Sequence, residues 1–224
     1  MKLRLAVINM FAILSIIFIA GCAPQALVAP SDEGMEMTLK VKPGKSDEVR
    51  QQIAELAAEK AKKRLRVLGV RKSNVETGAD AVIIIRTFSS MDKELLVKMV
   101  GRPVMLELKV IDESIKADAV FMAGKFVKSV EMEQDPFKKK NLLVQLNAQG
   151  SKLFADYTAR NIGRRVAVTI DDRIYFTAMI QDKIMGGQLI VKGFSSDDEA
   201  EALEGILETG PYSKDVHLLR LETF

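Results

Sequence analysis

The stretch AVIIIR, at positions 81–86, decides the fold of the first half of the chain. Its centre is one valine followed by three isoleucines, and an apolar run of β-branched residues indicates a buried strand. Gly78-Ala79-Asp80, just before it, predicts a turn, because these residue types tolerate tight backbone conformations. Ser73–Thr77 precedes the turn and predicts a short partner strand.

Elements of alternating type are expected on both sides of this strand pair. Apolar residues recur at three- and four-residue spacing upstream and stop at Gly69, as in an amphipathic helix with a glycine after its last turn. The elements predicted around positions 73–86 are a strand at 35–41, a helix at 49–68, a helix at 91–100 and a strand at 104–111. The resulting order predicts an α+β domain at 35–112 with the ferredoxin-like split β-α-β arrangement.

A second α+β region is predicted at 113–212, followed by a C-terminal strand segment at 213–224. Asp171-Asp172 separates two strand patterns and predicts a hairpin turn. Ser196 and Glu199 have the spacing of a capping box, in which each side chain accepts from the backbone of the other. The predicted strands lie around 126–132 and at 142–146, 165–170, 173–180, 188–191 and 217–222, and the predicted helices at 151–162 and 196–207.

The N-terminus has the pattern of an export signal. Lys2 and Arg4 precede an apolar run from Leu5 to Ala20, which is short for a helix that must cross about 30 Å of hydrocarbon. The run ends in Ile19-Ala20-Gly21-Cys22, which resembles a lipobox. We therefore expect a signal peptide at 1–21, lipid attachment at Cys22 and a tether at 22–34, with two-chain anchoring to a membrane. The alternative is an uncleaved single-span anchor with an incidental cysteine.

These features predict a cell-envelope lipoprotein that faces the periplasm. Ala23 stands where many lipoproteins retained at the inner membrane of enteric bacteria have an aspartate. This favours the outer membrane, but the sorting rule differs between bacteria. The choice between the two membranes therefore stays open.

Composition argues against several kinds of site. Among 224 residues the chain has one cysteine and one histidine, so Cys/His metal clusters and an internal disulfide are excluded by counting. His217 lies in an alternating strand, which favours a structural role. Asp171-Asp172 suits a turn and Asp197-Asp198-Glu199 a helix start, where acids complement the helix dipole. We expect no enzyme activity, cofactor or metal. We also expect no nucleic-acid partner, because nucleic-acid binders usually concentrate far more basic charge than the net +3 of this chain.

Two basic clusters and several methionines allow more than one interpretation. Lys138–Lys140 lies in a turn, and five basic residues are predicted on the solvated face of the first helix; anionic lipid headgroups are a possible partner for either cluster. Four methionines outside obvious helix cores fit core gap-filling, or a pliable surface that accepts varied segments. The helix cluster is Lys60, Lys62, Lys63, Arg64 and Arg66, and the methionines are Met122, Met132, Met179 and Met185.

A collinear series of short phrases resembles the first periplasmic domain of the SecD protein-export family. The phrases of the second region are Leu146-Asn147-Ala148-Gln149-Gly150, Phe154, Thr158, Asn161-Ile162-Gly163-Arg164, Ala167-Val168-Thr169-Ile170-Asp171, Gly186-Gly187, Val191-Lys192-Gly193-Phe194 and Gly210-Pro211. Arg64 with Leu68-Gly69-Val70, and Leu106–Val110, extend the resemblance upstream. Thr87-Phe88 and Phe176-Thr177-Ala178 depart from the family pattern, and no second apolar span is present.

The resemblance implies a non-catalytic, tethered binding domain that assists Sec-dependent translocation. Its partners would be unfolded exported polypeptide and Sec translocon components. The alternative is a structural or assembly lipoprotein of the envelope that uses the same fold for stable protein–protein contacts. An enzyme would need converging polar groups in a pocket, for which the sequence offers few candidates.

Overall fold

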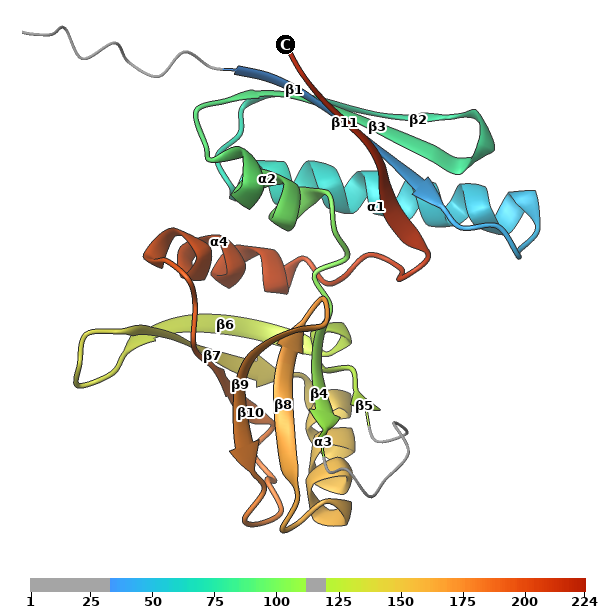
Figure 1. Cartoon of the computed structure of the whole chain (residues 1–224). Helices are drawn as coiled ribbons and strands as arrows, with labels where there is room; N and C mark the ends of the chain where they lie inside the picture. The colour runs from blue at the N-terminus through green and yellow to red at the C-terminus, as the bar shows by residue number, and fades with distance from the viewer. Residues whose placement is uncertain (1–32, 112–119) are drawn as a thin grey trace, which may run out of the picture. The chain divides into compact units, whose positions relative to one another are not determined.

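The computed structural model describes residues 33–111 and 120–224, which fall in one compact unit spanning Asp32–Phe224 (Figure 1). The predicted signal peptide, the lipidation site Cys22 and the tether as far as Asp32 lie outside the described residues. Within the described part, no helix has both the length and the apolar character needed to cross a membrane.

A four-stranded antiparallel sheet has the order β11-β1-β3-β2. The strands are β11 (Val216–Thr223), β1 (Glu33–Val41), β3 (Val82–Ser89) and β2 (Lys72–Gly78). Two helices, α1 (Asp47–Val67) and α2 (Lys93–Val100), lie on the same side of this sheet (Figure 1). The predicted strands and helices of this region are therefore present, with ends shifted by a few residues.

The core of this region lies between one face of the sheet and α1. Ile83 and Ile85 of the AVIIIR stretch are fully buried there, whereas Val82 and Ile84 are only half-buried on the opposite face. The stretch is thus a strand covered on one face, not on both. Ala54, Ala57 and Ala61 allow α1 to pack closely against the sheet, because they project only a methyl group.

The fourth strand of this sheet is not the one predicted. β4 (Leu106–Val110) pairs instead with β5 (Val120–Phe121) and β8 (Arg165–Ile170), in a different sheet. The position beside β1 is taken by β11, more than 170 residues downstream of β1. Val104, a buried β-branched residue with φ of 56°, redirects the chain just before β4.

Two further sheets make up the rest of the described chain. One has the order β10-β7-β6 and the other β5-β4-β8-β9, and helices α3 and α4 pack against the first. Short 3₁₀ turns lie at Ala79–Ala81 and Ala123–Lys125. The remaining elements are β6 (Val127–Gln134), β7 (Lys140–Leu146), α3 (Ala148–Arg160), β9 (Arg173–Met179), β10 (Gln188–Val191) and α4 (Asp197–Glu208).

The predicted hairpin at Asp171-Asp172 is confirmed. β8 and β9 pair on either side of it, and both aspartates have positive φ, 48° and 68°. Such a two-residue turn matches the right-handed twist of the flanking strands, and aspartate tolerates this backbone region better than most residues.

Candidate functional site

An open apolar groove of about 570 Å³ lies between β9 and β10. Buried side chains from α3, β8 and β10 line its inner part. Half-exposed and exposed apolar side chains from β9, β10 and the intervening loop line its mouth. The inner members include Phe154, Val166, Val168 and Leu189, and the outer members are Phe176, Met179, Ile184 and Ile190.

The groove exists because β9 and β10 approach each other at one end without pairing. Gly193 has φ of 88°, and a Cβ there would fall 2.4 Å from the Tyr175 carbonyl oxygen, so only glycine permits this approach. β9 is an edge of one sheet and β10 an edge of another. Two strand edges therefore border the same apolar hollow.

Polar contacts fix the wall of the groove. The Thr158 hydroxyl accepts a hydrogen bond from the Ile184 amide at 3.0 Å, which holds the loop after β9 against α3. Lys192 Nζ lies 5.3 Å from the centre of the Phe176 ring, so a cation stands at the mouth. Gln181, Asp182 and Gln188 complete a polar rim. The arrangement suits binding of an apolar, extended segment.

The four methionines of interest divide between core and surface. Met132 packs partly buried against the core, and Met122 is half-buried. Met179 lines the groove and is 57% exposed, whereas Met185 is exposed but is not a lining residue. Only Met179 therefore fits the prediction of a pliable binding surface.

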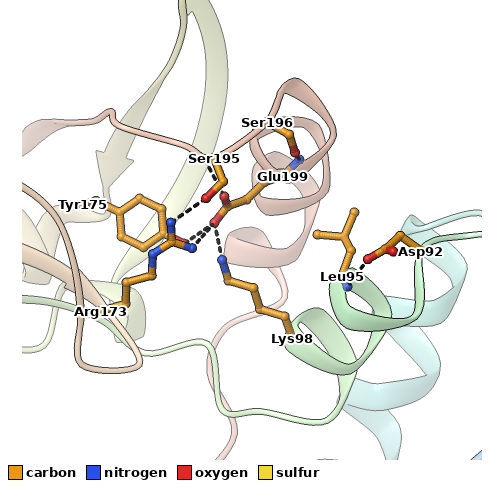
Figure 2. Close-up of polar contacts among 8 residues, drawn as sticks. All are labelled: Asp92, Leu95, Lys98, Arg173, Tyr175, Ser195, Ser196 and Glu199. Atoms are coloured by element: carbon orange, nitrogen blue, oxygen red, sulfur yellow. Dashed lines mark hydrogen bonds and ion pairs between the residues drawn. The ribbon is translucent and has the colours of Figure 1, made fainter.

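The carboxylate cluster at 197–199 contains a buried polar network centred on Glu199 (Figure 2). The Glu199 carboxylate accepts from Lys98 Nζ on α2, from the Tyr175 hydroxyl on β9 and from the Ser195 amide. Arg173 also pairs with it at 3.4 Å. Every oxygen is satisfied within the protein, which indicates a structural role.

Hydrogen bonds keep the carboxyl group of Glu199 ionised. Burial alone would raise the pKa of Glu199, but the bonds from Lys98, Tyr175 and the Ser195 amide outweigh it and lower the pKa to about 2. Burial and the bond to Glu199 raise the pKa of Tyr175 above its ordinary value. The predicted capping box is half present: Ser196 accepts from the Glu199 amide, but Glu199 accepts from Ser195 instead.

Arg64 was expected on a solvated helix face, and that expectation is wrong. Its side chain is fully buried and the guanidinium lies 3.9 Å from the centre of the Tyr212 ring. It donates to the carbonyl oxygens of Met99, Arg102, Pro103 and Gly210 and to the Thr209 hydroxyl. The signal was present in the sequence: position 64 follows Ala57 and Ala61 at helical spacing, on the apolar face of α1.

Lys60 also contacts the protein, because its ammonium donates a hydrogen bond to the Pro211 carbonyl oxygen at 2.7 Å. Lys62, Lys63 and Arg66 are exposed as predicted. In the second basic cluster, Lys138 and Lys139 are exposed, while Lys140 pairs with Glu201 and Asp197. The two basic clusters are therefore only partly solvated.

Two further candidate residues, Asp171 and His217, lie on separate elements of the fold. Asp171 accepts from the amides of Val104 and Met105, at 3.1 and 2.9 Å, and so holds the strained residue before β4. His217 lies on β11, in register with Lys40, and its Nδ1 has no hydrogen-bond partner among the described residues. No group of three or more potential metal ligands occurs in residues 33–111 and 120–224.

The segment that contains this groove is similar to a domain of known proteins. The family model "SecDF, P1 head subdomain" matches residues 107–213. The match begins inside β4, which pairs with β8 in the same sheet.

Relatives in sequence and structure are SecD proteins and their fusions. SecD of Dictyoglomus turgidum is 25% identical over 85% of this chain and 46% of its own length. SecD of Acidaminococcus fermentans is 28% identical over 66% of this chain and 34% of its own length. The chain thus spans less than half the length of these curated relatives.

Two solved structures share the fold. A structure of SecDF, a membrane component that enhances protein export, has a TM-score of 0.68 at 18% identity and covers 84% of this chain and 100% of its own. SecDF in its super-membrane-facing form has a TM-score of 0.72 at 20% identity, over 89% of this chain and 32% of its own. Residues 107–213 of this chain form a SecD-like head domain.

Proposed function

We propose that this chain is a non-catalytic binding module that assists protein translocation by holding extended, unfolded polypeptide in the groove between β9 and β10. The observation that carries the proposal is the combination of an apolar hollow with two bordering strand edges. An unfolded segment offers both apolar side chains and unpaired backbone groups. Strand addition satisfies the backbone, and the hollow receives alternate side chains.

The likeness to SecD supports the choice of partner. The named relatives are subunits of the protein translocase, and one neighbour in structure enhances protein export. By analogy, the module would work beside Sec translocon components, outside the cytoplasmic membrane. The strand order β11-β1-β3-β2 also supports the interpretation that the four-stranded sheet and its two helices form a ferredoxin-like base for the head domain.

Charges placed in the groove are expected to weaken polypeptide binding about tenfold or more, because a carboxylate there would be desolvated by the bound chain. Suitable variants are Met179→Glu and Ile190→Glu, both partly exposed in the free protein. Ile174→Glu is the matched control, since Ile174 is equally exposed on β9 but does not line the groove. Fluorescence anisotropy with a labelled, permanently unfolded polypeptide measures the affinity.

Equal affinities of the two groove variants and the unchanged protein would reject the groove as the binding site. In cells, a photo-crosslinker at Met179 should capture exported chains, whereas one at Ile174 should not. Capture of a single stoichiometric envelope protein at both positions would favour the alternative function in envelope assembly.

The proposed anchoring of this module rests on Cys22. We expect Cys22→Ser to abolish incorporation of labelled palmitate, because the thiol is the group that accepts the diacylglyceryl moiety. Metabolic labelling followed by immunoprecipitation measures this, and membrane fractionation then distinguishes the inner from the outer membrane. Absence of label on the unchanged chain would instead favour the single-span anchor.

A further inference from the structure

One end of the four-stranded sheet has a row of four residues that lie in register across its strands. Gly34 pairs with Phe224 through two backbone hydrogen bonds of 2.9 Å on one side and lies in register with Phe88 on the other. Phe88 in turn lies opposite Lys72 on β2. Phe224, Gly34, Phe88 and Lys72 thus form one row across the sheet, at the end where β1 begins.

Two aromatic rings stand exposed in this row. Phe88 and Phe224 meet edge to face with their centres 5.6 Å apart, although they are 43% and 65% exposed. A Cβ at Gly34 would fall 2.4 Å from the Phe224 ring, so the glycine leaves room for the ring to lie over the backbone. Exposed aromatic pairs of this kind suit a surface that is covered by something less polar than water.

Helix α1 ends at the same end of the sheet. β1 and β2 are both antiparallel to β3 and hence run in one direction, so α1 must return from the end of β1 to the start of β2. The last turns of α1 and the loop after it border an open hollow of about 720 Å³. We call it the basic hollow, and its polar side chains are Lys62, Arg66, Arg71, Ser73 and Asn74.

The cations of the basic hollow are largely uncompensated. Lys62 pairs with Glu59 at 2.8 Å, but the side chains of Arg66 and Arg71 have no ion-pair partner in the part of the chain that the structure describes. The negative end of the α1 dipole accounts for a cation at Arg66. It does not account for Arg71, which lies beyond the helix.

We propose that this end of the sheet docks on a membrane surface rich in anionic phospholipid. The phosphate headgroups would lie against Lys62, Arg66 and Arg71, and the Phe88–Phe224 pair would sit at headgroup level. Aromatic rings favour this interface, and cations are attracted to an anionic membrane surface. An acidic protein would satisfy the cations but gives no reason for the neighbouring exposed rings.

The entry point of the chain favours the same orientation. The described fold begins with β1 at this end, and β1 starts eleven residues after the predicted lipidation site Cys22. Eleven residues reach at most about 40 Å when fully extended. A lipid on Cys22 would therefore keep the basic hollow close to the bilayer, and the docking surface would add a second, electrostatic attachment.

Charge reversal at the basic hollow tests the proposal. With the full chain, Arg66→Glu/Arg71→Glu should lower the affinity for phosphatidylglycerol-containing vesicles about tenfold or more, and the affinity of the unchanged chain should fall with added salt. Lys138→Glu/Lys139→Glu is the matched control, because it changes the net charge equally at exposed positions elsewhere. Cosedimentation measures binding. The N-terminal apolar run is common to all variants, so its contribution cancels.

A site-specific probe separates docking from general charge attraction. An environment-sensitive fluorophore on Ser90→Cys, next to the end of β3, should shift to the blue on anionic vesicles, and one on Gln181→Cys should not; both carry Cys22→Ser. Equal losses in the two charge-reversed proteins, or equal shifts of the two probes, would overturn the proposal. Displacement of the chain from vesicles by millimolar inorganic phosphate at constant ionic strength would also overturn it. The same holds if Arg66→Glu/Arg71→Glu binds vesicles as the unchanged chain does but no longer binds an acidic protein.

Discussion

Replacing Arg64 by methionine is expected to lower the free energy of unfolding by about 3–5 kcal/mol, because several acceptors lose their donor at once. The side chain is fully buried, and it donates to four carbonyl oxygens and one hydroxyl, of which the Met99 carbonyl and the Thr209 hydroxyl form buried contacts. Methionine fills a similar volume but donates nothing, so these acceptors would stay unpaired at about 1–3 kcal/mol for each one that cannot rehydrate. The planar fork of arginine also lies on the Tyr212 ring.

The acceptors come from two separate segments, which explains why the expected loss is large. Met99 lies in the last turn of α2, Arg102 and Pro103 lie in the connection from α2 into β4, and Thr209 and Gly210 follow α4. These are the two covalent links between the four-stranded sheet region and the SecD-like head domain. One buried cation therefore fixes both links.

Urea unfolding of Arg64→Met, Arg64→Lys and Arg66→Met measures the effect. Arg66 lies two residues along the same helix and is exposed, so Arg66→Met should change the free energy of unfolding by less than about 0.5 kcal/mol. Arg64→Lys keeps the charge but reaches fewer acceptors. Its free energy of unfolding should therefore lie between those of Arg64→Met and Arg66→Met. A loss below about 1 kcal/mol for Arg64→Met would contradict the assignment.

Local patterns allowed most elements to be predicted, because helix and strand periodicities are set by neighbouring residues. The strand at 188–191 and the turn at Asp171-Asp172 are examples. The partner of a strand is a non-local property. Residues 104–111 and 216–223 both alternate, and nothing local decides which of them completes the sheet beside β1. The chain turns at Val104, just before β4, and the amide of this residue donates to Asp171, 67 residues downstream.

The groove was the part of the candidate site that was hardest to predict from the sequence. Phe176 and Ile190 fit ordinary strand patterns, and only the approach of Gly193 to Tyr175 leaves their strands side by side but unpaired. The methionine pattern left core gap-filling and a pliable surface open, and of these methionines Met179 lines the groove. The burial of Arg64, by contrast, could have been predicted from the sequence. Arg64 lies on the alanine face of α1, although its neighbours in sequence are charged.

Replacing Glu199 by glutamine is expected to lower the free energy of unfolding by about 2–4 kcal/mol near neutral pH and by much less in acid. The folded protein holds the pKa of Glu199 at about 2, below its ordinary value of 4.5. The carboxylate therefore contributes its full stabilisation above about pH 4.5, and the contribution is lost as the pH falls through about 2. Glutamine carries no charge at any pH, so this part of the pH dependence disappears with it.

The decisive measurement is the difference in unfolding free energy between the unchanged protein and Glu199→Gln, followed from pH 6 to pH 2.5 by urea titration. Other carboxylates titrate in both proteins and cancel in the difference. Glu201→Gln on the same helix is the control, because its ion pair with Lys140 is exposed and should contribute about 0–1 kcal/mol. A difference for Glu199→Gln that stays constant over this range would mean that the buried group is not an ionised carboxylate. The contacts from Lys98 and Tyr175 would then act as neutral hydrogen bonds.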